Sequence, residues 1–133
     1  MSLEQAVHQR WAATGALASL LPVENVTTGL ARADTLPYAT IARRLGRTTL
    51  RTNAGATQEE VTLRINVWHD DHDAGRAIAE QVDAAFDGAT FSLSSPARAV
   101  QMRRTDVQDS QRDDGIWRFA IEFLVNLHLT TGV

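Results

Sequence analysis

The stretch 61-VTLRINVWHDDHDAGRAIAEQVDAAFDG-88 places a buried strand directly before an amphipathic helix. In residues 61–68 the apolar side chains alternate with polar ones, which predicts a strand with one buried face. In residues 73–87 the apolar side chains recur every three or four positions, which predicts a helix. Gly88 is a typical C-terminal stop for that helix.

The residues on either side of this unit predict a second helix and a central strand. Ser2 and Gln5 match a capping box, and the apolar stripe that follows predicts an N-terminal helix that continues to Leu21, before Pro22. Residues 117–129 carry apolar side chains at seven alternate positions, so we expect a strand in the middle of the sheet.

Shorter segments complete the predicted sheet. Short strands are predicted at residues 23–26, 36–41 and 89–93, and Arg98, Val100 and Met102 begin another extended segment. Residues 43–60 have few apolar anchors and many threonines, which indicates a long exposed hairpin or arm. The polar residues 109–115 are interpreted as a loop that joins the last two strands in an antiparallel hairpin.

Length and composition predict one α+β domain over residues 1–133, with a mainly antiparallel sheet and both helices packed on one face. A chain of 133 residues with 44% apolar and 22% charged residues can bury its own core. No apolar run reaches the roughly 20 residues that span a bilayer, and the N-terminus lacks a secretory signal pattern, so we expect a cytoplasmic protein without a membrane association.

Two amino acids that support much of enzyme chemistry are missing. The chain has no cysteine, which excludes disulfides, thiolate metal sites and a cysteine nucleophile. It has no lysine, which excludes a P-loop lysine and Schiff-base chemistry. No nucleophile-elbow or dinucleotide motif occurs, and we expect neither catalytic residues nor a cofactor. A net charge of −3 argues against specific nucleic-acid binding, the least favoured alternative.

The order of these elements resembles a known family. The motifs are L-P-Y-x-x-I at residues 36–41, V-x-L-x-I-x-V-W at 61–68, G-R-x-I-A-x-x-V at 75–82, and a closing strand hairpin. They resemble the small tail-completion, or tail-terminator, proteins of long-tailed bacteriophages and prophages. That resemblance implies an α+β structural protein whose subunits form a ring, typically of six, that ends the tail tube and offers a head–tail joining surface.

The resemblance also implies the partners and the place of such a protein. They are further copies of itself, the major tail tube protein and a head-completion or connector protein. The protein would be cytoplasmic during assembly and part of the virion tail in an active phage.

Eight residues are candidate subunit or partner contacts. They lie on the arm, at the end of the strand and on the last hairpin: Arg47, Arg51, Asn53, Trp68, Arg103, Arg104, Asp113 and Asp114. On the hairpin, the arginine and aspartate pairs either face neighbouring subunits or pair across the strands, and local pairing is favoured.

The three tryptophans are assigned from their phase. Trp11 and Trp117 share the phase of apolar stripes and are expected in the core. Trp68 is out of phase with its strand, so it should point to the opposite face. There it packs under the first helix or lies at an interface, and packing is the favoured interpretation.

The cluster His69-Asp70-Asp71-His72-Asp73 is the strongest enzymatic signal in the sequence. Two imidazoles and three carboxylates could hold a metal, so a small metal-dependent enzyme is the alternative function. We favour a structural interpretation, in which Asp70 or Asp73 caps the helix that follows. His8 and His128 stand alone and are interpreted as surface or hydrogen-bonded residues.

Overall fold

The structure is a computed structural model that describes residues 2–29, 36–51, 56–94, 97–111 and 114–130, with the backbone alone at 45–51, 56–57, 94, 97–98 and 129–130. Its elements are α1 Leu3–Ala13, α2 Gly15–Leu20, a 3₁₀ turn Val23–Asn25, β1 Val26–Thr28, β2 Tyr38–Arg51, β3 Ala56–His69, α3 His72–Phe86, β4 Thr90–Ser94, β5 Ala97–Gln111 and β6 Trp117–Thr130. None of the described helices is both long and apolar enough to cross a membrane.

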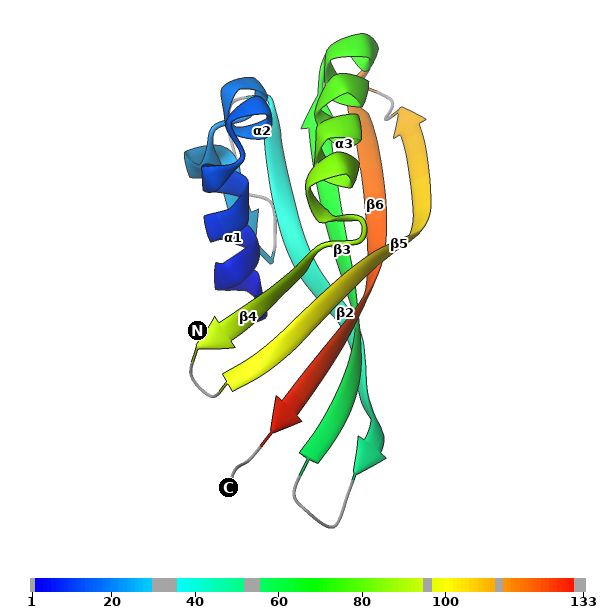
Figure 1. The fold of residues 1–133 in the computed structure, drawn as a ribbon. Helices are drawn as coiled ribbons and strands as arrows, with labels where there is room; N and C mark the ends of the chain where they lie inside the picture. The colour runs from blue at the N-terminus through cyan, green and yellow to red at the C-terminus, as the bar shows by residue number, and fades with distance from the viewer. Residues whose placement is uncertain (1, 30–35, 52–55, 95–96, 112–113, 131–133) are drawn as a thin grey trace.

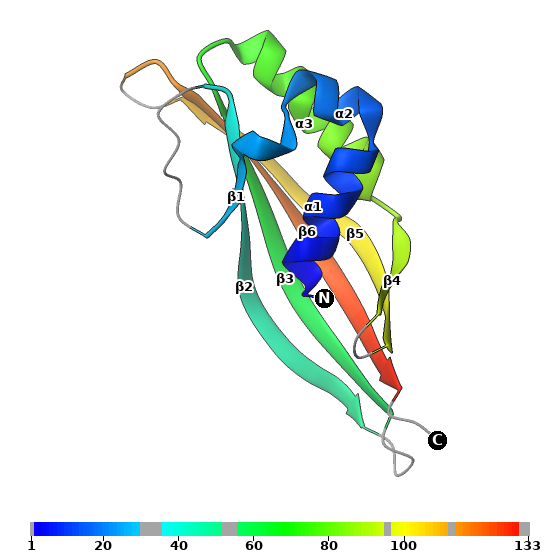
Figure 2. The same ribbon diagram turned by 90° about the vertical axis from the view of Figure 1, so that its left-hand side faces the viewer.

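The six strands form one sheet in the order β1-β2-β3-β6-β5-β4. Among the described strands, β1 pairs with β2 in parallel, and the other pairs are antiparallel. The three α-helices lie together on one face of the sheet (Figure 1, Figure 2). The predicted α+β class, with a mainly antiparallel sheet covered by helices on one face, is therefore confirmed.

The core is built on the two central strands, β3 and β6. Their register brings apolar side chains opposite one another in four consecutive rows: Val61 with Val125, Leu63 with Phe123, Ile65 with Ile121, and Val67 with Phe119. All eight are buried beneath the helices. Both strands alternate in the same phase, so pairing them puts every apolar side chain on one face. The prediction that the last strand is central is confirmed.

Helix α3 begins and ends close to the predicted limits. Asp71 is its N-cap, and the carboxylate accepts a hydrogen bond from the Asp73 amide at 3.2 Å. Asp71 therefore has the capping role that the sequence had assigned to Asp70 or Asp73. Gly88 follows the C-cap with a φ of 74°, a backbone conformation that favours glycine after a helix.

The N-terminal segment contains two helices, so the prediction of one continuous helix is wrong. The break is Thr14, whose backbone is extended and whose hydroxyl donates to the Arg10 carbonyl at 2.7 Å. Beyond the break, Leu17 and Leu21 are fully buried. The Trp11 indole donates to the Leu21 carbonyl at 2.9 Å. This tertiary hydrogen bond and the burial of both leucines favour the turned-back chain over a straight helix.

Strands β2 and β3 pair as a hairpin over most of the segment predicted as an arm. Pairing continues to Arg51 opposite Thr57, which confirms a hairpin, although both strands are longer than predicted. Register shifts after Arg43 and after Thr48 interrupt the alternation. A bulge shifts the phase of the side chains, so no period-2 pattern marks these residues as strand.

Two other boundaries differ from the sequence predictions. A short strand was predicted at residues 23–26, but Val23–Asn25 form the 3₁₀ turn. Strand β1 begins three residues later than predicted, at Val26. The predicted loop at 109–115 begins later than expected, because β5 continues to Gln111. A strand at the edge of a sheet can carry polar side chains. Its backbone hydrogen-bonds to one neighbouring strand while the side chains remain in water.

His8 predicts a loss of stability at acid pH. Burial lowers the pKa of this side chain, whose Nε2 lies 3.2 Å from the Thr28 hydroxyl. The unfolded chain therefore takes up the proton first as the pH falls. This contribution to stability is intact above about pH 6.5, the ordinary histidine value, and is lost as the pH falls towards the lowered folded value. We expect His8→Gln, which does not titrate, to show a smaller loss between pH 7.5 and pH 5 in urea unfolding. An identical pH dependence in both proteins would contradict this assignment.

Candidate functional site

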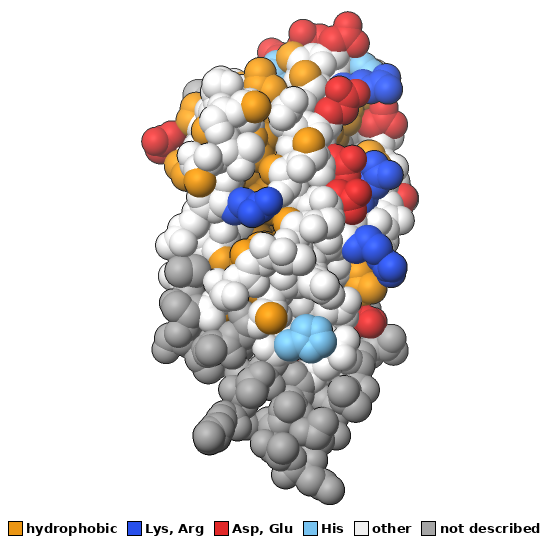
Figure 3. Space-filling model, viewed as in Figure 1, with side chains coloured by type: hydrophobic (Ala, Val, Ile, Leu, Met, Phe, Trp, Pro, Cys, Tyr) orange, Lys and Arg blue, Asp and Glu red, His pale blue; other side chains and the backbone are white. Residues whose placement is uncertain are grey.

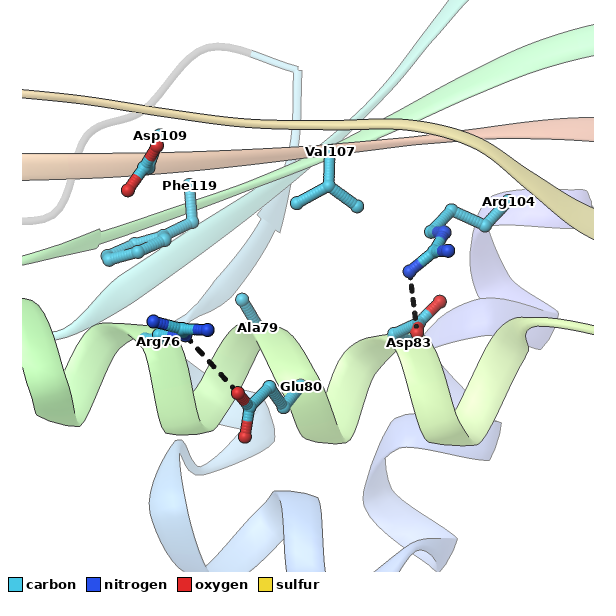
Figure 4. A pocket seen from close by; sticks show the side chains of 8 residues that line it. All are labelled: Arg76, Ala79, Glu80, Asp83, Arg104, Val107, Asp109 and Phe119. Atoms are coloured by element: carbon cyan, nitrogen blue, oxygen red, sulfur yellow. Dashed lines mark hydrogen bonds and ion pairs between the residues drawn. The ribbon is translucent and has the colours of Figure 1, made fainter.

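A groove runs between α3 and β5 on the helix-covered side of the sheet. It has a volume of about 430 Å³. Its floor is apolar and consists of Ala79, Val107 and Phe119, while charged side chains form its walls (Figure 4): Arg76, Glu80, Asp83, Arg104 and Asp109. The groove exists because α3 lies mainly over β3 and β6 and leaves this part of β5 uncovered.

The charges on the walls are largely paired with one another. Arg76 Nε lies 3.3 Å from Glu80, one helical turn away, and Arg104 donates to Asp83 Oδ2 at 3.0 Å. Asp109 Oδ2 lies 3.3 Å from His72 Nε2. A charged ligand would have to compete with these pairs, whereas an apolar side chain needs only the floor. The groove is therefore suited to an apolar side chain.

One buried wall atom has no hydrogen-bond partner among the described residues. Asp83 Oδ1 is buried and accepts no hydrogen bond from any described residue. A buried carboxylate oxygen without a donor costs free energy, so a donor that enters the groove from outside would find an acceptor already in place.

Beside the groove, β5 has an open edge. β4 pairs with β5 only as far as Gln101, and Met102 is then bonded to Ala89. The Arg104 amide donates to the Asp87 carboxylate at 2.9 Å. For residues 105–111 no described residue bonds to the outer side of the strand, and these side chains are exposed. An open edge of this kind can accept a strand from another chain.

The face of the sheet away from the helices is polar and half-buried. Glu122 Oε2 is shared by Arg44 and Arg64, each at 3.0 Å, across three strands. On the same face, Thr27 Oγ1 and Asn66 Oδ1 are buried without a hydrogen-bond partner in the described part of the chain. No described helix covers this face (Figure 2).

Trp68 lies on this polar face, as its phase predicted. It stacks on Tyr38, with ring centroids 4.9 Å apart and planes 19° from parallel. The favoured interpretation, packing under the first helix, is wrong, because α1 covers the opposite face. The tryptophan packs on a neighbouring strand and stays partly exposed.

Arg104 pairs with the helix and not along its hairpin. It lies opposite Phe123 in the register and binds Asp83, whereas Asp114 is in the turn before β6 and accepts from the Ile116 amide. Cross-strand pairing of Arg104 with Asp114 is therefore wrong. Arg103 is exposed on β5.

The other candidate contacts are only partly described. Arg47 and Arg51 are on β2, where the backbone alone is described, and Asn53 and Asp113 are outside the described residues.

The histidine cluster does not converge. His69 Nδ1 accepts the Asp71 amide at 3.0 Å, and the His72 ring packs edge-on against Trp117, with centroids 4.5 Å apart. Trp117 was predicted to lie in the core. It is partly buried and packs against the core. Among the described residues no three histidine, aspartate or glutamate side chains are placed to hold a metal ion.

Sequence reasoning missed most of the groove. Val107 has no apolar neighbours in the sequence that would mark it, Ala79 was named only within the motif at 75–82, and Phe119 was assigned to the buried face of the last strand. Their common position depends on the lateral placement of α3 on the sheet, for which the sequence has no local signal. The Arg64–Glu122 pair had a weak signal, because both residues fall at polar positions of alternating strands.

The sequence matches the family described as Tail completion protein gp17 over residues 5–126. No curated protein matches the sequence. Among solved structures, a chain of the "Virion of native gene transfer agent (GTA) particle" is similar, with a TM-score of 0.74 at 18% identity over 96% of this chain and 95% of that chain. Another solved structure has a TM-score of 0.61 at 15% identity over 95% of this chain and 96% of that chain. At these identities the two similarities show a shared fold.

Proposed function

Since the chain belongs to the tail completion protein gp17 family, whose members are structural proteins of phage tails, we propose that it forms a ring that ends the tail tube and provides the surface for head–tail joining. The observation that carries this proposal is the family match over residues 5–126, which includes α2, α3 and strands β1 to β5 in full and most of α1 and β6. The fold shared with a chain of a gene transfer agent virion supports it.

The shape of the molecule is compatible with a ring. A ring requires two different surfaces on each subunit, which meet in a head-to-tail contact. The two flanks of this molecule differ: one carries the small helices α1 and α2, and the other carries the groove and the open edge of β5 (Figure 1). A subunit with two unlike flanks suits a head-to-tail contact better than a two-fold contact.

The proposed partners follow from the proposed position at the end of the tail. They are further copies of the chain, six in a ring, the major tail tube protein below, and a head-completion or connector protein above. We keep Trp68 and Arg103 as proposed contacts with these partners, because both are accessible at the polar face of the sheet. The whole chain is proposed to act as one domain.

The mass of assembled protein tests this proposal. Concentrated protein is examined by light scattering and negative-stain imaging, alone and with purified tail tubes, and the metal content of each peak is assayed. We expect rings, in solution or on tube ends. A protein that forms no ring and does not bind tube ends would contradict the proposal. Stoichiometric metal in a small species would favour the enzyme alternative.

A further inference from the structure

Two large apolar side chains are exposed among the described residues, and they lie on opposite flanks of the molecule. Leu20 in α2 has 43% of its surface exposed, and Val107 in β5 has 45%. One exposed apolar side chain is ordinary for a soluble protein. The arrangement here is more specific, because Val107 lies in the groove on one side of α3, whereas α2 lies on the other side of α3 (Figure 1).

The exposed surface of α2 is apolar and uncharged. The helix, GALASL, has no charged residue, and Ala16 and Ser19 are exposed beside Leu20. Ala12 and Ala13, at the end of α1, are exposed as well. Apolar side chains gather over these two helices in the space-filling view, whereas charged side chains gather along the opposite flank beside α3 (Figure 3).

β1 and the open part of β5 also lie at the same height along the strand direction. At one edge Thr28 pairs with Ile41, Ile41 with Ile65, and Ile65 with Ile121, which pairs with Val107 at the other edge. β1 and the open part of β5 therefore lie on the same row of the sheet. A neighbouring copy needs no shift along the strands to bring its β1 beside this β5.

The strand directions are also suitable. β1 is parallel to β2, and three antiparallel steps lead from β2 through β3 and β6 to β5. β1 therefore runs antiparallel to β5. In a ring whose axis lies roughly along the strands, the neighbour keeps this direction, so its β1 meets β5 in the more stable antiparallel arrangement.

We propose that α2 of a second copy docks in the groove between α3 and β5, with Leu20 against Val107 and Phe119 and with β1 beside the open edge of β5. The apolar floor of the groove suits an apolar, uncharged helix. The charged side chains of the walls already pair with one another, so they do not require a charged partner. Asp83 Oδ1 is available for a donor from the incoming chain. Because the two surfaces lie on opposite flanks, a pair of docked copies still has one free α2 and one free groove. Further copies can therefore add until the rotation between subunits closes a ring.

This inference rests on the proposed function, since it describes the contact between subunits of the proposed ring. The first test uses Leu20→Asp and Val107→Asp, each of which places a carboxylate in an apolar contact. We expect each variant to lower the ring fraction by about tenfold or more, because an unpaired charge is costly to bury. Gln9→Asp, at an exposed position of α1, is the matched control and should assemble as the wild type does.

Mixing the two variants tests the head-to-tail geometry. The Leu20→Asp protein keeps an intact groove, and the Val107→Asp protein keeps an intact α2. Together they should form a one-to-one complex and nothing larger. Circular dichroism and thermal unfolding establish that both variants are folded before mixing.

Cross-linking provides a test that does not depend on the stability of the ring. The chain has no cysteine, so the double variant Leu20→Cys, Val107→Cys carries the only two thiols. Oxidation should produce a ladder of multimers, whereas each single variant should stay largely monomeric. Single variants that cross-link as dimers to the same extent would overturn the proposal.

The outcomes separate this inference from the proposed function. If both aspartate variants form rings to the same fraction as the wild type, the α2 contact is overturned and the proposed ring remains. A wild-type protein that forms no ring and binds no tube ends, together with a double cysteine variant that produces no ladder, would overturn both.

Discussion

Replacing Trp11 with alanine is expected to lower the free energy of unfolding by about 3–5 kcal/mol, the usual cost of removing a large buried aromatic side chain. Trp11 is fully buried, and its ring lies 6.5 Å from that of Phe86 at the end of α3. Its indole N–H also donates to the buried Leu21 carbonyl at 2.9 Å. The side chain therefore joins α1, α2 and α3. Urea unfolding followed by circular dichroism measures the loss.

A series of variants separates the packing of Trp11 from its hydrogen bond. Trp11→Phe keeps an aromatic ring but leaves the Leu21 carbonyl without a donor, which costs about 1–3 kcal/mol for a buried group. Trp68→Phe is the control, because Trp68 is partly exposed and a phenylalanine can keep the stack on Tyr38. Equal losses in these two phenylalanine variants would show that the hydrogen bond to Leu21 contributes nothing measurable.

Gly75→Ala is expected to be the second most damaging of these changes. A Cβ at this position would overlap Phe119 Cε2 and would lie 3.0 Å from His69 Cβ. Phe119 is buried in the central strand and has little space to move, so α3 itself must shift. We expect a loss of about 1–3 kcal/mol in the free energy of unfolding, the usual cost of overpacking. Thermal and urea unfolding would both report it.

Gly15→Ala is the matched control for this change. A Cβ at Gly15 would meet no atom within 4 Å, and the residue is the first of α2. Here the loss of glycine's conformational freedom in the unfolded chain should stabilise the protein by about 0.4–1 kcal/mol. The two substitutions are chemically identical, so opposite signs isolate the contact of α3 with β6. A Gly75→Ala protein as stable as the wild type would contradict the close packing of α3.

The groove that we propose as a subunit contact depends on the same packing. Phe119 forms part of the groove floor and is also the residue that Gly75 approaches. Moving α3 away from β6 would change the distance between the groove walls. A shifted α3 should therefore also weaken assembly, whereas Gly15→Ala should leave α3 in place.

Several elements were determined by local signals in the sequence. The alternation in residues 61–68 and 117–129 defined two central strands, because buried strands leave a period of two. The acidic turn and Gly88 marked the ends of α3 within a residue or two. The capping box at Ser2 and Gln5 is present as predicted, with both reciprocal hydrogen bonds. These features depend on residues close in sequence, and the local chain therefore carries the information.

The tertiary structure alone decided the rest. The break at Thr14 depends on the hydrogen bond from Trp11 to Leu21, and the length of β2 and β3 depends on backbone pairing past two bulges.

The groove, the Arg104–Asp83 pair and the matching row from Thr28 to Val107 depend on strand order and on the lateral position of α3. These are relations between residues far apart in the sequence. Only packing of the whole chain brings them together, and no periodic pattern within one segment records which segments will become neighbours.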